Sequence, residues 1–241
     1  MDPLRIFIGY DSKEPVAYHV LAQSILRRAS CPVAFTPLVQ DQLRAAKLYT
    51  RPRGPTESTE FSMTRFLVPC LCEYRGLAIF MDCDMLCQAD VAELVALAHA
   101  QSNKAVLICP HEYTPRTDKK FLGQVQTSYP RKNWSSLMIF NLQHFGCRML
   151  TVPYVNKASG LELHRFNWLD NQMIGELPLE WNWLVGEYDP NPQAKLLHYT
   201  LGGPWFSETR DCDQADAWRQ EYERLGRPAI KALAQGVKAG G

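Results

Sequence analysis

Apolar residues along the chain follow two patterns that alternate through most of its length. Continuous apolar runs, typical of strands covered on both faces, occupy residues 4–9, 32–39, 76–82, 104–110, 135–142 and 194–198. Apolar residues at helical spacing occupy 14–30, 58–74, 91–101, 167–177 and 214–240. This alternation predicts an α/β fold with helices on both faces of a sheet.

One segment interrupts the alternation. Residues 113–133 are polar and basic and show neither pattern, so we expect an irregular loop there. No linker divides the predicted elements into groups. We therefore predict a single domain over 1–241, with a helical C-terminal tail over about 213–241.

Composition narrows the class of protein. The 241 residues are 46% hydrophobic, enough for a core, and their net charge of +1 does not indicate a nucleic-acid partner. We see no signal peptide and no apolar run of about 18 residues, the length of a transmembrane segment. Most of the eight cysteines lie in apolar runs, so we expect reduced thiols and a cytoplasmic protein.

The stretch "LAIFMDCDMLC" carries the strongest chemical signal, because a buried strand runs directly into Asp82 and Asp84. Residues i and i+2 of an extended segment face the same way, about 6.5–7 Å apart. Open α/β sheets bind ligands at the carboxyl ends of their strands. Two carboxylates converging there repel each other unless a cation or proton lies between them. Hard oxygen ligands favour Mg²⁺ or Mn²⁺, although two solvated turn aspartates would also fit the pattern.

A second strand end adds to this signal. "LLHYTLGGPWF" places His198 after an apolar strand, followed by Gly202 and Gly203. Two aspartates and one histidine would make a three-ligand metal site, and a glycine turn allows backbone N–H groups to approach an anion. A metal beside such a turn suggests a diphosphate. On its own, His198 would equally suit a core or turn histidine.

Four stretches together resemble a known family: "RIFIGYD", "STEFSMTRFLVP", "LAIFMDCDM" and "HYTLGGPW". They are similar to glycosyltransferase family 8 and its bacterial relatives, retaining glucosyl- and galactosyltransferases that include glycogenin. The resemblance implies a GT-A fold with a Rossmann-like mixed sheet. It also implies transfer of a hexose from a nucleotide-diphosphate sugar, UDP-linked, with retention of configuration.

The resemblance also implies a role for each matched residue. The metal, Mn²⁺ or Mg²⁺, would be bound by Asp82, Asp84 and His198, and the donor nucleotide would lie near Asp11, Arg65 and Asp82. The phosphates would lie near Gly202 and Gly203. The catalytic residues beside the transferred sugar would be Asp170 and Asn171. The family usually has glutamine at the position of Asn171 and lysine at that of Gly203. Because that lysine is missing, we expect Arg65, Arg131 or Lys132 to add positive charge near the diphosphate. Arg131 and Lys132 would equally suit solvated loop residues, and Asp170 would equally suit a helix-start or surface carboxylate.

Other interpretations remain open at this point. The acceptor is unidentified; a glycan, a lipid-linked saccharide, a protein or a small molecule would each fit, and a glycolipid acceptor would imply peripheral association with the inner face of a membrane. One alternative is a non-catalytic protein of the same fold that binds a nucleotide-sugar or carbohydrate. A phosphatase of the haloacid-dehalogenase type also uses D-x-D after a strand. However, Leu86 occupies the position where that class has Thr or Val.

Overall fold

The computed structural model describes residues 2–54, 57–112 and 131–226. Most of the loop predicted over 113–133, and the end of the predicted C-terminal tail, lie outside these residues. All eight cysteines are free thiols. Among the described helices, none has both the length and the apolar character needed to cross a membrane.

A six-stranded mixed sheet forms the centre of the molecule, with strand order β2-β1-β3-β6-β5-β7. Strand β6 runs antiparallel to its neighbours β3 and β5, and the remaining neighbouring strands are parallel. The strands are β1 (Leu4–Gly9), β2 (Val33–Leu38), β3 (Leu77–Met81), β5 (Val106–Ile108), β6 (Leu137–Asn141) and β7 (Ile174–Glu176). The predicted mixed α/β architecture is confirmed.

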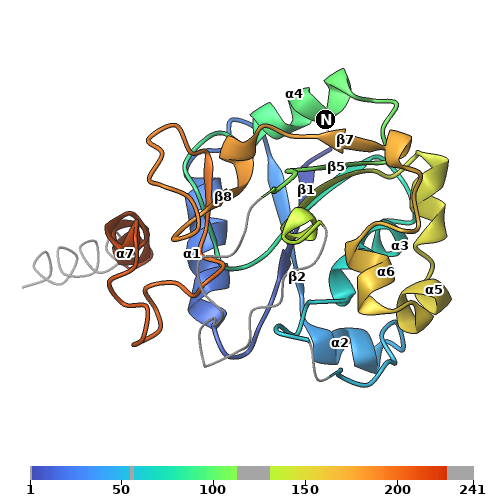
Figure 1. Cartoon of the computed structure of the whole chain (residues 1–241), viewed down its shortest axis with the longest axis horizontal. Helices are drawn as coiled ribbons and strands as arrows, with labels where there is room; N and C mark the ends of the chain where they lie inside the picture. The colour runs from blue at the N-terminus through green and yellow to red at the C-terminus, as the bar shows by residue number, and fades with distance from the viewer. Residues whose placement is uncertain (1, 55–56, 113–130, 227–241) are drawn as a thin grey trace, which may run out of the picture.

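Helices cover both faces of this sheet, as the unbroken apolar runs require. Ala78, Ile79, Phe80 and Met81 of β3 expose none of their surface. Figure 1 shows α1 and α7 on one side of β1 and β2, and α3, α5 and α6 on the other. The helices are α1 (Pro15–Leu26), α2 (Gln40–Ala45), α3 (Val68–Leu71), α4 (Ala92–Ala100), α5 (Val152–Lys157), α6 (Gly160–His164) and α7 (Ala215–Arg224).

A second, smaller sheet brings distant parts of the chain together. Its order is β4-β9-β8, with β4 (Met85–Cys87), β9 (Leu196–His198) and β8 (Trp183–Leu184). In the antiparallel β4–β9 pair, Met85 lies opposite His198. This register places the end of the D-x-D motif beside a histidine more than a hundred residues later in the chain.

The helix predicted over 58–74 is wrong in part. The structure has turns, a 3₁₀ helix η1 (Thr64–Leu67) and then the short α3. Pro69 has no N–H to donate to the carbonyl four residues earlier, so it suits the first turn of α3 but not the interior of a longer helix.

The helix predicted over 167–177 is also wrong. This segment contains a 3₁₀ turn, η5 (Asn171–Met173), followed by β7. In β7, Ile174 pairs with Val106 at the edge of the sheet. Pairing with β5 decides the structure of this short segment, because helical spacing over so few apolar residues is ambiguous.

The helices α5 and α6 were not predicted, although their starts carry recognisable signals. The Thr151 side chain accepts the N–H of Tyr154 at the start of α5. Ser159 and Glu162 form a capping box at the start of α6. Both helices are short, so their apolar spacing is weak and the caps carry most of the information.

Helix α7 is attached to α1 through a buried carboxylate. Glu221, only 1% exposed, lies 3.1 Å from Arg27, 3.1 Å from Arg28 and 3.3 Å from Arg224. Burial alone would raise the pKa of Glu221, but the hydrogen bonds from Arg27 and Arg28 outweigh it and lower the pKa. The ionised carboxylate therefore stabilises the packing of α7 on α1.

We predict that Glu221→Ala lowers the free energy of unfolding by about 1–3 kcal/mol, because it removes a buried partner from arginines that can still reach water. The folded-state pKa is depressed, so this stabilisation is present above the unfolded-state pKa and is lost as the pH falls through the folded-state value. Urea denaturation at neutral and acid pH measures the free energy of unfolding of each variant. Glu223→Ala, a change at an exposed neighbour on the same helix, is the control. Equal stability of the two variants at neutral pH would contradict the assignment.

Candidate functional site

Asp82, Asp84 and His198 converge at the carboxyl end of β3. One ligand atom from each side chain lies within 4.8 Å of the others. The Nε2 atom of His198 is 3.3 Å from an Asp84 carboxylate oxygen. The backbone supports this geometry, because Tyr199 N–H donates to the Asp84 carbonyl at 2.9 Å. The structure thus brings together the three residues that the sequence predicted as a metal site.

The His198 ring is oriented by a side chain that the sequence did not reveal. Its Nδ1 atom lies 2.9 Å from the Asn182 amide oxygen, and the Asn182 amide nitrogen donates to Ser136 Oγ at 2.8 Å. Ser136 Oγ in turn donates to the Asn133 carbonyl at 2.6 Å. With Nδ1 held by Asn182, Nε2 faces the aspartates. Ligating histidines in metalloproteins are commonly held in this way.

Arg65 lies against Asp82 inside the protein. It is 5% exposed, and its Nη1 atom is 2.8 Å from the Asp82 carboxylate and 2.8 Å from the Ser135 carbonyl. Its guanidinium lies over the rings of Phe61 and Phe80, at 5.3 and 4.9 Å. Arg65 was predicted near the donor nucleotide. The structure gives it a definite contact with a predicted metal ligand, where it offsets one of the two converging charges.

Asp11 organises the loop that precedes α1. It is 2% exposed, and its two carboxylate oxygens accept the N–H groups of Lys13 and Glu60, at 3.0 and 3.2 Å. These bonds join the end of β1 to the segment before η1. The structure therefore shows a loop-forming role for this predicted nucleotide-binding residue.

The two glycines after β9 form a tight buried turn. Gly202 has φ +110, a value that side-chain-bearing residues rarely adopt, and its N–H donates to the Tyr199 carbonyl at 2.8 Å. A Cβ atom on Gly203 would lie 2.0 Å from the Trp205 ring. The turn and its contact with Trp205 therefore explain why glycine is needed at both positions.

Asp170 and Asn171 lie just before β7, outside the cluster of Asp82, Asp84 and His198. They precede β7, which runs parallel to β5. Because Ile174 pairs with Val106, the segment enters the sheet beside the start of β5. The contact of Asn171 with Arg131 links it to the segment whose Ser135 and Ser136 carbonyls accept hydrogen bonds from Arg65 and from the Asp82 N–H. Asp170 and Asn171 are both exposed.

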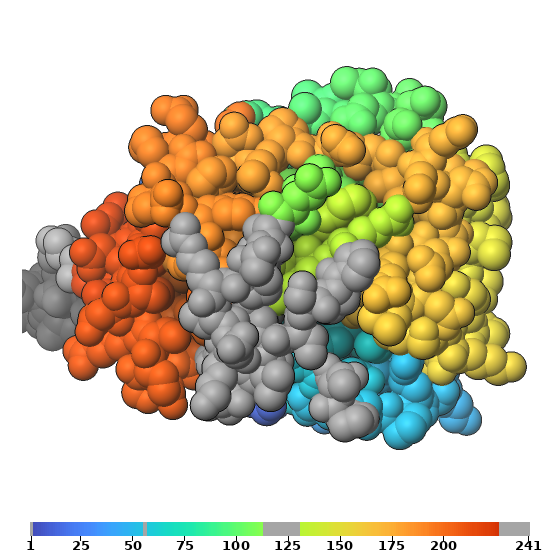
Figure 2. Space-filling model, in the orientation of Figure 1, coloured from blue at the N-terminus to red at the C-terminus, as the bar shows by residue number. Residues whose placement is uncertain are grey.

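Arg131 contacts one of these predicted catalytic residues. Its guanidinium donates to the Asn171 side-chain oxygen and to the Arg165 carbonyl, each at 2.6 Å, and lies 5.2 Å from the Trp134 ring. Its neighbour Lys132 is only 7% exposed. Figure 2 shows the yellow-green surface of this part of the chain between the orange surface near β8 and the gold surface near α6.

Two further histidines, the buried His111 and the partly buried His164, flank the site, and neither was predicted. His111 follows β5; its Nδ1 atom is 2.9 Å from the Tyr188 hydroxyl, and burial, with a smaller effect of His198, lowers its pKa to about 3. His164 lies 2.7 Å from Ser135 Oγ, and burial, with Arg65 nearby, lowers its pKa to about 3. The position of His111 just after a buried apolar strand was the available signal, because the D-x-D motif occupies the equivalent position after β3.

Comparison with solved structures identifies the fold. The chain is similar to the WbbM bifunctional glycosyltransferase (TM-score 0.63, 17% identity, 97% of this chain and 51% of that one). It is also similar to the glycosyltransferase GlyE of Streptococcus pneumoniae (0.61, 12%, 92% and 60%). A third similar structure is the galactosyltransferase LgtC in complex with donor and acceptor sugar analogs (0.53, 11%, 92% and 96%). The chain thus spans about half of WbbM and 60% of GlyE. The fold is of the GT-A type, as predicted.

Sequence comparison places the chain in a family. It is 47% identical over 230 residues to Protein CDI of Arabidopsis thaliana, covering 93% of this chain and 88% of that protein. The chain therefore belongs to the same family as Protein CDI. No protein-family model matches the chain, so membership of glycosyltransferase family 8 stays a prediction.

We predict that His111 makes stability depend on pH. It stays neutral in the folded protein, with a pKa of about 3, but is protonated below about pH 6.5 in the unfolded chain. Stability should therefore fall as the pH drops from about 6.5 toward 3, by about 1.4 kcal/mol per pH unit from this residue. Urea denaturation of metal-free protein should show a shallower slope for His111→Gln and the wild-type slope for the exposed control His99→Gln. The same slope in all three proteins would rule the effect out.

Proposed function

We propose that this protein is a metal-dependent glycosyltransferase that moves a hexose from a UDP-sugar to an acceptor, with retention of configuration. The observation that carries the proposal is the convergence of Asp82, Asp84 and His198 at a strand end of a GT-A fold. The similar structures are glycosyltransferases, and LgtC was solved with donor and acceptor sugar analogs. A phosphatase of the haloacid-dehalogenase type has no comparable support from the fold.

The three side chains suit a divalent metal. Two carboxylates and one imidazole offer hard oxygen and borderline nitrogen ligands, a set that accepts Mn²⁺ or Mg²⁺. Asn182 holds the His198 ring so that Nε2 faces the carboxylates. When bound, such a metal would offset the negative charge that develops on a diphosphate leaving group.

The remaining site residues have supporting roles in the proposal. Arg65 holds the Asp82 carboxylate in place, so it acts on the donor through Asp82. Asp11 shapes the loop beside the nucleotide, and the Gly202–Gly203 turn lies along the phosphates. Asp170 and Asn171 are proposed beside the transferred sugar, and Arg131 fixes the Asn171 amide.

The acceptor and the location in the cell belong to the proposal as well. The acceptor is a glycan, a glycolipid or another hydroxyl-bearing molecule. The protein acts in the cytoplasm, and a glycolipid acceptor would bring it to the inner face of a membrane. We propose no nucleic-acid partner.

We predict that a UDP-sugar panel with Mn²⁺ reveals release of UDP by the wild-type protein. Asp84→Asn should lower the rate by about a hundredfold or more, because it weakens metal binding. The matched control Asp41→Asn, at an exposed position on α2, should keep the wild-type rate. Full activity in excess EDTA, in protein shown by elemental analysis to be free of metal, would refute the metal requirement.

We predict that Asp170 contributes to the chemical step more than to donor binding. A carboxylate beside the anomeric carbon opposes the positive charge that develops there, and interactions made mainly in the transition state lower kcat when removed. Asp170→Asn should reduce kcat at least about tenfold, with donor affinity by calorimetry close to wild type. A parallel loss of donor affinity would assign Asp170 to binding instead, and Asp189→Asn serves as the exposed control.

A further inference from the structure

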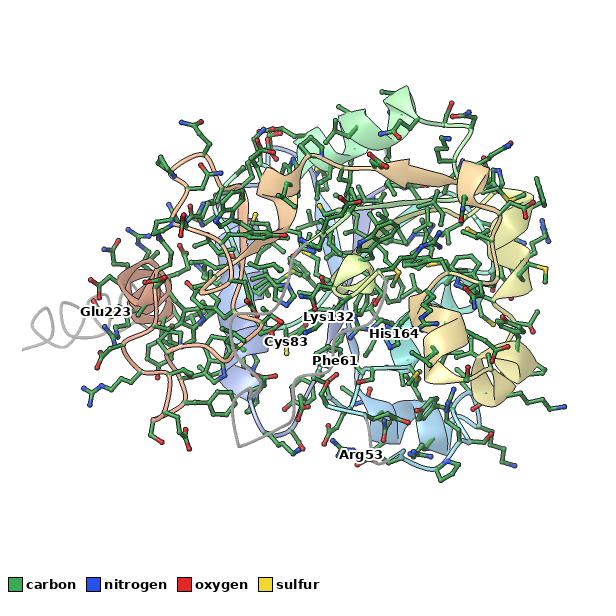
Figure 3. The ribbon with its side chains drawn as sticks, in the orientation of Figure 1. Arg53, Phe61, Cys83, Lys132, His164 and Glu223 are labelled. Atoms are coloured by element: carbon green, nitrogen blue, oxygen red, sulfur yellow. The ribbon has the colours of Figure 1, made fainter. Side chains whose placement is uncertain are left out.

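Glu14 is a buried carboxyl group that contacts both segments of the proposed metal site. It is 3% exposed and occupies the N-cap position of α1, yet its side chain makes no cap hydrogen bond. One carboxyl oxygen lies 3.7 Å from the Cys83 sulfur, and the other accepts the Trp205 indole N–H at 3.0 Å. Figure 3 shows Cys83 near the middle of the molecule.

These two contacts link the segments that carry the three proposed ligands. Cys83 lies between Asp82 and Asp84, and its side chain is fully buried. Trp205 belongs to the turn that follows His198, and its ring lies 5.8 Å from the Tyr199 ring. One side chain, at the N-cap of α1, therefore connects the D-x-D motif to the His198 turn.

A carboxyl group at this position is energetically unfavourable by itself. Burial, together with the negative charges of Asp84 and Asp11, raises the pKa of Glu14 well above its usual value. An apolar side chain would avoid that cost of desolvation. A carboxyl group can instead accept the indole N–H and contact the thiol with two differently directed oxygens, which an apolar side chain cannot do.

We propose that Glu14 is a positioning residue that fixes the D-x-D motif relative to the His198 turn, and thereby sets the geometry of the metal ligands. The expected effect of Glu14 on metal binding rests on the proposed function, in which Asp82, Asp84 and His198 bind a metal. In this proposal Cys83, whose side chain is fully buried, is the contact between Glu14 and the D-x-D motif. The thiol contacts Glu14 while the aspartates on either side converge on His198.

Mn²⁺ affinity of the full-length protein, measured by paramagnetic resonance of free Mn²⁺, tests the positioning role. Glu14→Gln keeps the shape and one acceptor for the indole N–H, so its affinity should stay within about threefold of wild type. Glu14→Ala and Trp205→Phe should each weaken binding at least about tenfold, the usual effect of losing a group that orients metal ligands. Asn156→Ala, which removes hydrogen bonds to Leu48, Thr50 and Val152 far from these contacts, is the control for general loss of stability.

Two outcomes would overturn the proposal. Wild-type affinity in both Glu14→Ala and Trp205→Phe would show that the link does not position the ligands. Equal weakening in Glu14→Gln and Glu14→Ala would show that Glu14 acts through its negative charge and not through its two contacts. Because Trp205→Phe keeps most of the ring packing, it provides the test even if Glu14→Ala does not fold.

Hydrogen exchange in metal-free protein separates this proposal from the proposed function. The Gly202 N–H bonds to the Tyr199 carbonyl within the turn that Trp205 packs against. Glu14→Ala or Trp205→Phe should speed exchange of this amide, and Asn156→Ala should leave it unchanged. Unchanged exchange in the first two variants would refute the link. Absence of Mn²⁺ binding and of UDP release in the wild type would refute the proposed function. The exchange result would then still show whether Glu14 links the D-x-D motif to the His198 turn.

Discussion

Repulsion between the carboxylates of Asp82 and Asp84 is the constraint that shapes the candidate site. Like charges converging at a partly buried strand end raise the free energy of the folded state unless positive charge lies nearby. Arg65 provides that charge at Asp82, 2.8 Å away, with its guanidinium over the rings of Phe61 and Phe80. His198 lies 3.3 Å from Asp84. A divalent cation among these groups would offset the remaining repulsion, so the arrangement favours metal binding.

The rest of the fold holds this arrangement in place. The main sheet fixes Asp82, whose N–H donates to the Ser136 carbonyl at 2.9 Å, and the second sheet fixes Asp84 beside His198. Glu14, just before α1, contacts both Cys83 in the D-x-D motif and Trp205 after β9. Such a site depends on tertiary structure as a whole, because no single helix or strand contains more than a part of it.

The sequence predicts the strands and the metal-ligand candidates better than it predicts their surroundings. Strand β1 and the D-x-D motif after β3 stand out because continuous apolar runs end at polar residues. The segment over 167–177 was misjudged because edge pairing with β5, not local periodicity, decides its conformation. Asn182 and Glu14 could not be predicted, since their contacts are made with residues far away in the chain and depend on how the two sheets and α1 pack.

The central claim is that Asp82, Asp84 and His198 bind one divalent metal together with the diphosphate of a nucleotide. A crystal grown with Mn²⁺ and UDP, with anomalous diffraction measured at the manganese edge, tests it most directly. The account predicts one anomalous peak within bonding distance of both carboxylates and of His198 Nε2, with the diphosphate oxygens completing the coordination. Bound UDP with no manganese between these side chains, or manganese bound elsewhere on the protein, would contradict it.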